Sequence, residues 1–348
     1  MEKIDIKSME YGELLNYFIS IGEKKFRCDQ VFGWFHNKLI TSFDEMSNIS
    51  KDLKEKLNTE TELVHLKVIQ KLISQIDGTE KFLFQLKDHN VIESVLMKYK
   101  HGNSVCISSQ VGCKMGCTFC ASTIGGLVRN LRASEMLEQV YSIQRESGER
   151  VSNVVIMGTG EPLDNFDELM KFISVITDEK GLNISIRNIT VSTCGLVDKI
   201  KTLADKKIGI TLAISLHASN DEIRKKTMPI AKKFSIEELL DACKYYIHKT
   251  NRRITFEYSL ISGVNDTKKD AEELCKLLKG LLCHVNLIPI NPIKERNYQQ
   301  GSKESIVNFK SVLEKNGITA TIRRELGRDI QAACGQLRKS YGENRIEK

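Results

Sequence analysis

The chain has 348 residues, enough to bury a full core and to form one large domain with a small one beside it. Hydrophobic residues make up 41% of it and charged residues 28%, and no apolar run approaches the roughly 20 residues of a membrane span, so a membrane-spanning protein is excluded. The net charge of +7 permits an anionic partner such as nucleic acid without requiring one.

The N-terminal stretch MEKIDIKSMEYGELL lacks the apolar core of a signal peptide, so we expect a cytoplasmic protein with no membrane association. Its ten cysteines should be reduced in that compartment. Clustered cysteines are then better interpreted as metal ligands or catalytic groups than as a disulfide framework.

Residues 1–90 are expected to form a small helical accessory domain with a nucleic-acid docking face. Apolar residues recur at helical spacing over residues 11–21, 27–40 and 47–57. A solvated surface explains any single lysine here, but as a group beside Trp34, the only tryptophan, the basic residues suggest a nucleic-acid docking face. They are Lys24, Lys25, Arg27, Lys38, Lys51, Lys54 and Lys56.

Residues 91–348 are expected to form an α/β domain. Two strands are predicted at the boundary, one at 81–86 before it and one at 92–99 after it, with a turn at 88–90. Short apolar runs then alternate with amphipathic segments, which indicates a parallel sheet. The runs cover 104–108, 153–157, 188–192, 210–215, 254–260 and 284–290, and the helical segments cover 133–146, 166–177, 196–204, 236–248 and 268–278. Six units predict a partial (β/α)6 barrel of TIM-like type, which a strand at 318–323 could extend.

Polar, loop-forming residues follow five of these strands at the same end, where reacting groups of such barrels lie. A cysteine loop follows the first strand. The sequence G-T-G-E-P at 158–162 follows the second, S-T-C-G at 192–195 ends the third, S-L-H at 215–217 ends the fourth, and N-P at 291–292 ends the sixth.

The cysteine loop contains Cys113, Cys117 and Cys120, spaced C-x3-C-x2-C. Three thiolates are too few to close a four-ligand site, so a metal centre bound here keeps an open position. They could hold three irons of a four-iron cluster, or zinc with a further ligand. Spacing alone leaves zinc open, although the nearest histidine, His101, precedes the first strand.

These motifs together resemble the radical S-adenosylmethionine (radical SAM) enzymes and, more narrowly, the RlmN family. The resemblance covers about residues 1–340 and rests on C-I-S-S-Q-V-G-C at 106–113, M-G-T-G-E-P at 157–162, S-L-H at 215–217, N-L-I-P-I-N-P at 286–292 and D-I-Q-A-A-C-G-Q-L at 329–337. It implies methylation of adenine carbon 2 in 23S rRNA, at the peptidyl transferase centre, and in some tRNAs, 3′ of the anticodon. Thr159, where many relatives carry methionine, is a minor departure.

The resemblance also implies the cofactor site. Cys113, Cys117 and Cys120 would hold a [4Fe-4S] cluster, with the amino and carboxyl groups of SAM on its open iron. Taken singly, the other matching residues have simpler interpretations as turns, caps or a buried histidine, and their collection at one barrel face favours the cofactor role. The implied SAM-binding residues are Gly160, Glu161, Ser192, Ser215, Leu216, His217 and Asn291.

Two further cysteines, Cys334 and Cys106, would by sequence alone be inert buried thiols. The resemblance implies that a first SAM methylates Cys334 and that a second SAM yields a radical that abstracts hydrogen from the S-methyl group. The methylene radical adds to carbon 2 of adenine, and a base removes the carbon 2 proton. Attack by the Cys106 thiolate on the Cys334 sulfur then releases the product and leaves a disulfide.

The resemblance implies that Glu93 is the general base, and an ordinary exposed glutamate at the start of a strand is the alternative. The basic segment 323–328 adjoins Cys334 and could contact phosphates, or be a solvated loop. We expect a flipped-out adenine. We also expect two SAM molecules per turnover, an electron donor such as flavodoxin or ferredoxin, and a monomeric enzyme.

Two alternatives remain at this point. The sister Cfr family modifies carbon 8 of the same adenine, and Pro162 favours RlmN because the sister group tends to have alanine there. A non-enzymatic RNA-binding protein with structural zinc is the alternative from another class.

Overall fold

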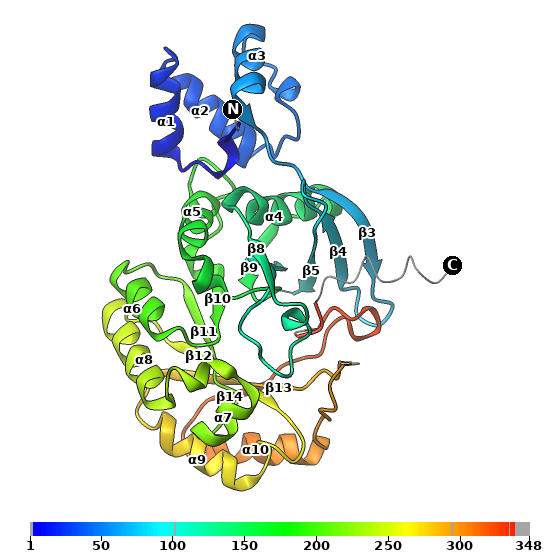
Figure 1. Ribbon diagram of the computed structural model, residues 1–348, viewed down its shortest axis with the longest axis vertical. Coiled ribbons are helices and arrows are strands. Elements are labelled where there is room, and N and C mark those ends of the chain that lie inside the picture. Colours follow the sequence, from blue (N-terminus) through cyan, green and yellow to red (C-terminus); the bar gives the residue numbers. More distant parts are fainter. Residues whose placement is uncertain (1–2, 101, 294, 334, 338–348) are drawn as a thin grey trace.

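The computed structural model describes residues 3–100, 102–293, 295–333 and 335–337 (Figure 1). Its centre is a ten-stranded sheet with the strand order β14-β13-β12-β11-β10-β9-β6-β5-β4-β3. Three helices, α1 (Tyr11–Ser20), α2 (Lys25–His36) and α3 (Lys51–Glu60), form a separate group at one end of the molecule (Figure 1). The three helices predicted for the N-terminal segment are therefore confirmed.

The six predicted parallel strands are β6 (Gly102–Ile107), β9 (Val151–Ile156), β10 (Ile189–Thr193), β11 (Thr211–Ser215), β12 (Ile254–Leu260) and β13 (Cys283–Pro289). Each pairs in parallel with the next, and β14 (Ala320–Ile322) extends the run. The partial barrel is confirmed.

The helices between these strands match the predicted segments. They are α4 (Ala133–Ser147), α5 (Phe166–Thr177), α6 (Val197–Asp205), α8 (Ile236–Thr250) and α9 (Lys268–Leu278). Two helices were not predicted, α7 (Asp221–Thr227) and α10 (Lys303–Lys315).

Three antiparallel strands extend the other edge of the sheet: β3 (Lys67–Ile73), β4 (Glu80–Gln85) and β5 (Val91–Tyr99). The last two match predicted strands, whereas β3 was not predicted. The barrel sheet therefore begins before residue 90, where the sequence analysis divides the chain into two domains. A small hairpin of β7 (Gln110–Gly112) and β8 (Leu127–Asn130) also went unpredicted.

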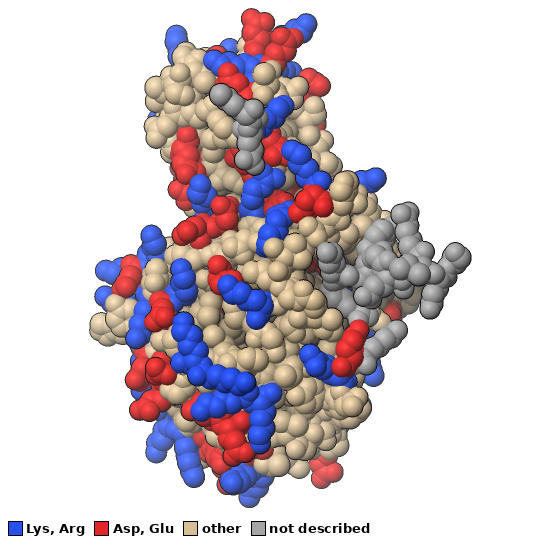
Figure 2. Space-filling model, viewed as in Figure 1, with Lys and Arg blue, Asp and Glu red and all other residues tan. Residues whose placement is uncertain are grey.

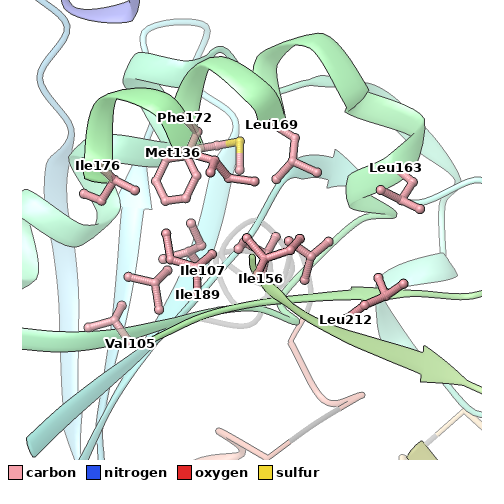
Figure 3. Close-up of a cluster of buried hydrophobic side chains, with 14 of the residues drawn as sticks. Val105, Ile107, Met136, Ile156, Leu163, Leu169, Phe172, Ile176, Ile189 and Leu212 are labelled. Carbon is pink, nitrogen blue, oxygen red and sulfur yellow. The ribbon is translucent and has the colours of Figure 1, made fainter. Parts of the chain in front are cut away.

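A core of apolar side chains joins the sheet to α4 and α5 (Figure 3). Ile107, Ile156 and Ile189 rise from neighbouring strands toward Met136 of α4 and Phe172 of α5, and all five are essentially buried (Figure 3). Because successive side chains of a strand point to opposite faces, the residues between them face the barrel interior. The same alternation that builds the core thus directs a second set of side chains toward the site.

Buried charges join the N-terminal segment to the barrel. Lys7 Nζ donates hydrogen bonds to Glu138 Oε1 and to the carbonyl of Val64, each at 2.7 Å, and neither charged side chain is exposed. Arg145 reaches the other oxygen of Glu138 at 2.8 Å. Nearby, His36 of α2 pairs with the Tyr141 hydroxyl at 2.9 Å. The Lys7–Glu138 pair is buried with its hydrogen bonds made, and such a pair favours one docking geometry over others.

Acidification is expected to destabilise the protein through His36. Burial lowers the pKa of His36 to about 3, whereas histidine in an unfolded chain titrates near about 6.5. Between these values the unfolded state binds more protons, so the free energy of unfolding should fall by up to about 1.4 kcal/mol per pH unit below about 6.5. Urea unfolding at several pH values should show a smaller pH slope for His36→Gln. His89→Gln, in the exposed β4–β5 turn, is the control and should keep the wild-type slope. Equal slopes for wild type and His36→Gln would contradict the prediction.

Within the described part of the chain, no helix combines the length and apolar character needed to cross a membrane.

Candidate active site

A cavity with an empty volume of about 960 Å³, open to solvent at its mouth, lies at the carboxyl ends of the parallel strands. Most residues that the sequence analysis assigned to the cofactor line it, although they come from five separate segments. They are Cys113, Cys117, Cys120, Gly160, Glu161, Ser192, Ser215, His217 and Asn291. The structure therefore brings together at one place what the chain keeps far apart.

Elements on both sides support the cysteine loop. On one side, the amide of Cys113 donates to the carbonyl of Gly126 at 3.0 Å, next to the β7–β8 hairpin. On the other, the amide of Thr118 donates to the carbonyl of Thr227, the last residue of α7, at 2.9 Å. At Gly112, with φ 75°, a Cβ atom would lie 2.0 Å from the Gly126 carbonyl oxygen, so only glycine fits.

The three thiols of the loop share one electrostatic environment. Burial raises the pKa of Cys113 to about 12 and raises the pKa of Cys117 further, and ionised Cys120 acts in the same direction on both. Burial thus disfavours the thiolate forms, and a positive centre among them would stabilise these forms. No three His, Cys, Asp or Glu side chains of the described residues are placed to hold a single metal ion. A four-iron cluster has no such need, since each thiolate binds a different iron, and the donor set fits that group.

The glycines after β9 meet a packing requirement. A Cβ atom at Gly158 would lie 2.7 Å from the carbonyl oxygen of Ile107. At Gly160, with φ 108°, it would lie 2.6 Å from Cβ of Gln110. The Gln110 side chain in turn accepts the amide of Glu161 at 2.8 Å. Close packing on the segment after β6 thus accounts for both glycines before any ligand is considered.

Glu161 carries a buried carboxylate at the end of β9. Its Oε2 accepts the amide of Cys194 at 2.7 Å and its Oε1 accepts the amide of Leu163 at 3.1 Å. Burial raises the pKa of this carboxyl, and these hydrogen bonds lower it only in part. No lysine or arginine among the described residues forms an ion pair with Glu161. A cationic ligand in the cavity would supply the missing positive charge.

His217 is held as a neutral hydrogen-bond donor. Its Nδ1 accepts the backbone amide of Ser259 at 2.9 Å, which assigns the ring proton to Nε2. Burial lowers the pKa of His217 to about 3, so the ring is uncharged near neutral pH. The backbone is in the left-handed region at φ 53°, and the ring meets Phe119 of the cysteine loop edge-on. Leu216, also assigned to the cofactor, has a fully buried side chain and does not line the cavity.

The sequence analysis missed Glu257, a buried carboxylate in the middle of β12 that lines the cavity. Burial raises its pKa, while Arg323, 3.7 Å away, and a hydrogen bond of 2.9 Å from Asn286 lower it. Its strand neighbours Phe256 and Tyr258 point into the core, and Ser259 lines the cavity too. This alternation was the available signal.

Cys106 and Glu93 lie outside the cavity lining, on the neighbouring strands β6 and β5. Cys106 is buried in a small apolar cluster with Val95, Met97, Ala332 and Leu337. Glu93 is also buried, which excludes the exposed glutamate considered above, and it pairs with Lys81 at 3.1 Å. Lys81 Nζ in addition donates to the carbonyl of Gln331 at 3.2 Å.

Cys334 itself lies outside the described residues, but its neighbours are anchored on both sides. Before it, Asp329 accepts the Ser74 hydroxyl at 2.7 Å, and the amide of Gly327 donates to Asp77 at 2.9 Å, so the β3–β4 turn holds this segment. After it, the carbonyl of Gly335 accepts the amide of Ala121, next to Cys120, at 2.8 Å.

No two of the nine described cysteines are joined by a disulfide. Cys194, interpreted from the sequence as an inert buried thiol, in fact lines the cavity. Burial raises its pKa well above the ordinary value, and the carboxylate of Glu161 adds to this effect.

Comparisons with known families cover most of this architecture. Residues 4–63 match the N-terminal domain of ribosomal RNA large subunit methyltransferases, and residues 107–278 match the radical SAM superfamily. The crystal structure of a radical SAM methyltransferase from Sphaerobacter thermophilus superposes with a TM-score of 0.93 at 43% identity, covering 97% of this chain and 99% of that one.

Two curated relatives are similar over nearly their whole length. A probable dual-specificity RNA methyltransferase RlmN of Lachnospira eligens is 62% identical over 340 residues, covering 98% of this chain and 97% of the relative. One of Alkaliphilus oremlandii with the same description is 59% identical over 344 residues, covering 99% and 100%. The chain belongs to the RlmN family of dual-specificity RNA methyltransferases within the radical SAM superfamily.

Proposed function

We propose that this protein methylates carbon 2 of adenine in 23S rRNA and in some tRNAs, through a methyl group carried on Cys334. The observation that carries the proposal is the cavity, in which nine residues assigned from sequence to the cluster and SAM lie together. Cys106 lies beside it, in contact with the segment that bears Cys334.

Cys113, Cys117 and Cys120 would hold the [4Fe-4S] cluster, and SAM would occupy the cavity beside them. When bound, the cluster supplies an electron and SAM supplies both the methyl group and the hydrogen-abstracting radical. The buried carboxylate of Glu161 suits the SAM ammonium because it lacks a cationic partner among the described residues. The neutral His217 offers an N–H donor, and Ser192, Ser215 and Asn291 add polar groups on the remaining walls.

The positions around Cys334 support its role in methyl transfer. Ala332 and Leu337 pack in the same apolar cluster as Cys106, so the side chain of Cys106 lies against this segment. Lys81 links Glu93 to the same segment, because it forms an ion pair with Glu93 and donates a hydrogen bond to the carbonyl of Gln331. We assign Cys106 as the nucleophile that releases product and Glu93 as the base that takes the carbon 2 proton.

A second, smaller cavity adjoins the first and suits the RNA side of the reaction. It shares Asn291 and Arg323 with the first cavity and adds Arg324, Tyr99 and Ala333. Guanidinium groups bind phosphates, and an aromatic ring can stack on an extruded base. A flipped adenine entering here would reach the neighbourhood of Cys334.

The N-terminal helices offer a first contact for RNA. Lys24, Lys25 and Lys38 are exposed, and Phe26 is 49% exposed with the Arg27 guanidinium over its ring. An exposed aromatic ring beside cations is suited to stacking on single-stranded bases. Trp34 is a weaker candidate than the sequence suggested, since its ring is partly buried and its N–H donates to Asn48 at 2.7 Å. Lysines and arginines are also scattered over the barrel face in Figure 2.

Replacing both Lys24 and Lys25 by glutamate is expected to weaken binding of tRNA. Each lost phosphate contact should reduce the steepness of log K against log salt by about 0.7 to 0.9. Equilibrium binding at several salt concentrations measures this. Lys268→Glu with Lys269→Glu, on α9 at the other end of the molecule (Figure 1), makes the same charge change and should leave binding near the wild-type value. Equal weakening by both pairs would contradict the N-terminal docking face.

Product analysis tests the reaction. The RNA from a reaction with SAM and a reductant should contain 2-methyladenosine, detected by nucleoside mass spectrometry against C2- and C8-methyl standards. Methyl at carbon 8 with none at carbon 2 would replace the proposal by the Cfr-like alternative. Anaerobically purified protein that holds zinc, and neither iron nor sulfide, would instead favour the non-enzymatic RNA-binding alternative.

We further propose a cytoplasmic, monomeric enzyme that receives electrons from a small acidic redox protein such as flavodoxin or ferredoxin. Exposed lysines on α7 and the turn after it lie next to the cysteine loop and suit such a donor. They are Lys225, Lys226, Lys232 and Lys233.

A further inference from the structure

Arg224 of α7 is the only arginine of the described residues that is fully buried. Its Nε donates to the carbonyl of Leu216 at 3.2 Å, and its Nη2 donates to the carbonyls of Cys194 at 2.7 Å and Ser215 at 3.3 Å. Nη1 is buried and makes no hydrogen bond to any described residue. A buried cation thus keeps one nitrogen unsatisfied.

Arg224 lies directly behind the cysteine loop. Its carbonyl accepts the amide of Met228 at 2.7 Å, and Met228 packs in one buried cluster with Cys117 and Cys194. The carbonyl of Thr227, at the end of the same helix, accepts the amide of Thr118 in the cysteine loop. The positive charge of Arg224 lowers the pKa of Cys117 and of Cys194, whereas burial, the larger effect, raises both.

The charge of Arg224 has no matching carboxylate. It forms no ion pair with any aspartate or glutamate that the structure describes, and burial lowers its pKa while ionised Cys194 and Cys117 act in the opposite direction. A buried guanidinium without a compensating charge is unfavourable, so such a residue is tolerated where a negative charge lies nearby. The cysteine loop is the adjacent site where negative charge collects once the thiolates hold a cluster.

We propose that Arg224 is a positioning residue that sets the reduction potential of the cluster, with Nη1 donating a hydrogen bond to a sulfur on the cluster side of the loop. This inference rests on the proposed cluster site. Reduction adds one negative charge to the cluster, and a fixed positive charge nearby stabilises the reduced form more than the oxidised form. Net charge and hydrogen bonds to sulfur are established determinants of such potentials. Arg224 therefore makes the cluster easier to reduce.

The test is the midpoint potential of the cluster, followed by EPR during a redox titration without SAM. Arg224→Met removes the charge and should shift the midpoint to a more negative value. At the wild-type midpoint, the ratio of reduced to oxidised cluster should fall about tenfold, which corresponds to about 59 mV for a one-electron couple. Arg224→Lys keeps the positive charge but cannot make all three hydrogen bonds to the carbonyls of Leu216, Cys194 and Ser215. Its midpoint potential should therefore stay closer to that of wild type, while its thermal stability should fall.

The control is Arg145→Met, which removes another largely buried arginine from the Glu138 contact on α4. It should lower stability and leave the midpoint unchanged. Arg224→Met with full iron content and a wild-type midpoint would overturn the proposal. So would a shift seen only after SAM is added, because Nη1 would then serve the SAM carboxylate.

If Arg224→Met does not fold, the midpoint potentials of Arg224→Gln, which is neutral, and Arg224→Lys, which is charged, can be compared instead. Equal midpoints for these two variants would overturn the proposal. A wild-type protein that takes up no iron would refute the proposed cluster itself, which is a different result from any of these.

Discussion

Replacing Cys117 by alanine is expected to abolish cluster binding and RNA methylation together. Cys117 lines the cavity and is buried in one cluster with Met228 and Cys194, and it is the middle cysteine of the loop proposed to hold the cluster. Loss of residues that merely support metal ligands costs about 10- to 100-fold in metal affinity or activity, so loss of a ligand should cost more. After anaerobic reconstitution, iron and sulfide content and the visible absorption of the cluster should be nearly absent.

The matched control is Cys243→Ala, which removes a buried thiol from α8 that does not line the cavity. This variant should bind iron as wild type does and lose only some stability, because a small cavity remains in the core. Wild-type iron and sulfide in the Cys117 variant, or equal losses in both variants, would mean that the C-x3-C-x2-C loop is not the cluster site.

The barrel could be predicted because each parallel strand repeats a strong local pattern. Strands such as β9 and β11 are short, apolar and followed by amphipathic helices, and tertiary packing agrees with that pattern. The strand β3 has the sequence KVIQKLI on a half-exposed edge, where burial imposes little alternation. It could be recognised only through its pairing with β4, which is a long-range contact.

Helix α10 is a different kind of omission. Ile306, Phe309 and Leu313 recur at helical spacing and are buried, so the signal was present in the sequence. Helix α7 carried little signal, since DEIRKKT contains a single large apolar residue. Tertiary contacts determine the structure of this segment, and they bury Arg224 in a sequence that otherwise resembles an exposed surface helix.

The same distinction applies to the candidate site. Its cysteines were predictable because their spacing in sequence is tied to their chemistry. Glu257 had a signal in the alternation of β12, which the sequence analysis did not use. Arg224 had none, since a lone charge in a short helix usually faces solvent, and only the tertiary fold turns it inward. Local motifs therefore indicated the cofactor, while the charges that surround it had to be found in the structure.

Replacing Cys106 by alanine is expected to trap the enzyme covalently on its RNA. In the proposed reaction the methylene carbon joins the Cys334 sulfur to carbon 2 of adenine, and the Cys106 thiolate attacks that sulfur. A sulfur–sulfur bond forms and the carbon–sulfur bond breaks, and the departing carbon keeps the electron pair of that bond and takes up a proton to become the methyl group of the product. Without Cys106 the last step has no nucleophile, so the adduct should accumulate as a band of lower mobility that ribonuclease removes.

The structure makes this test specific, because Cys106 packs against Ala332 and Leu337 on either side of position 334. Cys334→Ala should give neither product nor adduct, and the double variant should match it. Cys283→Ala, at the start of β13 and outside the cavity, should turn over as wild type does and show no adduct. Normal product release by Cys106→Ala would remove the resolving role from Cys106. An adduct that also forms in Cys334→Ala would place the linkage on a different residue, and the methyl carrier would then have to be sought elsewhere in the site.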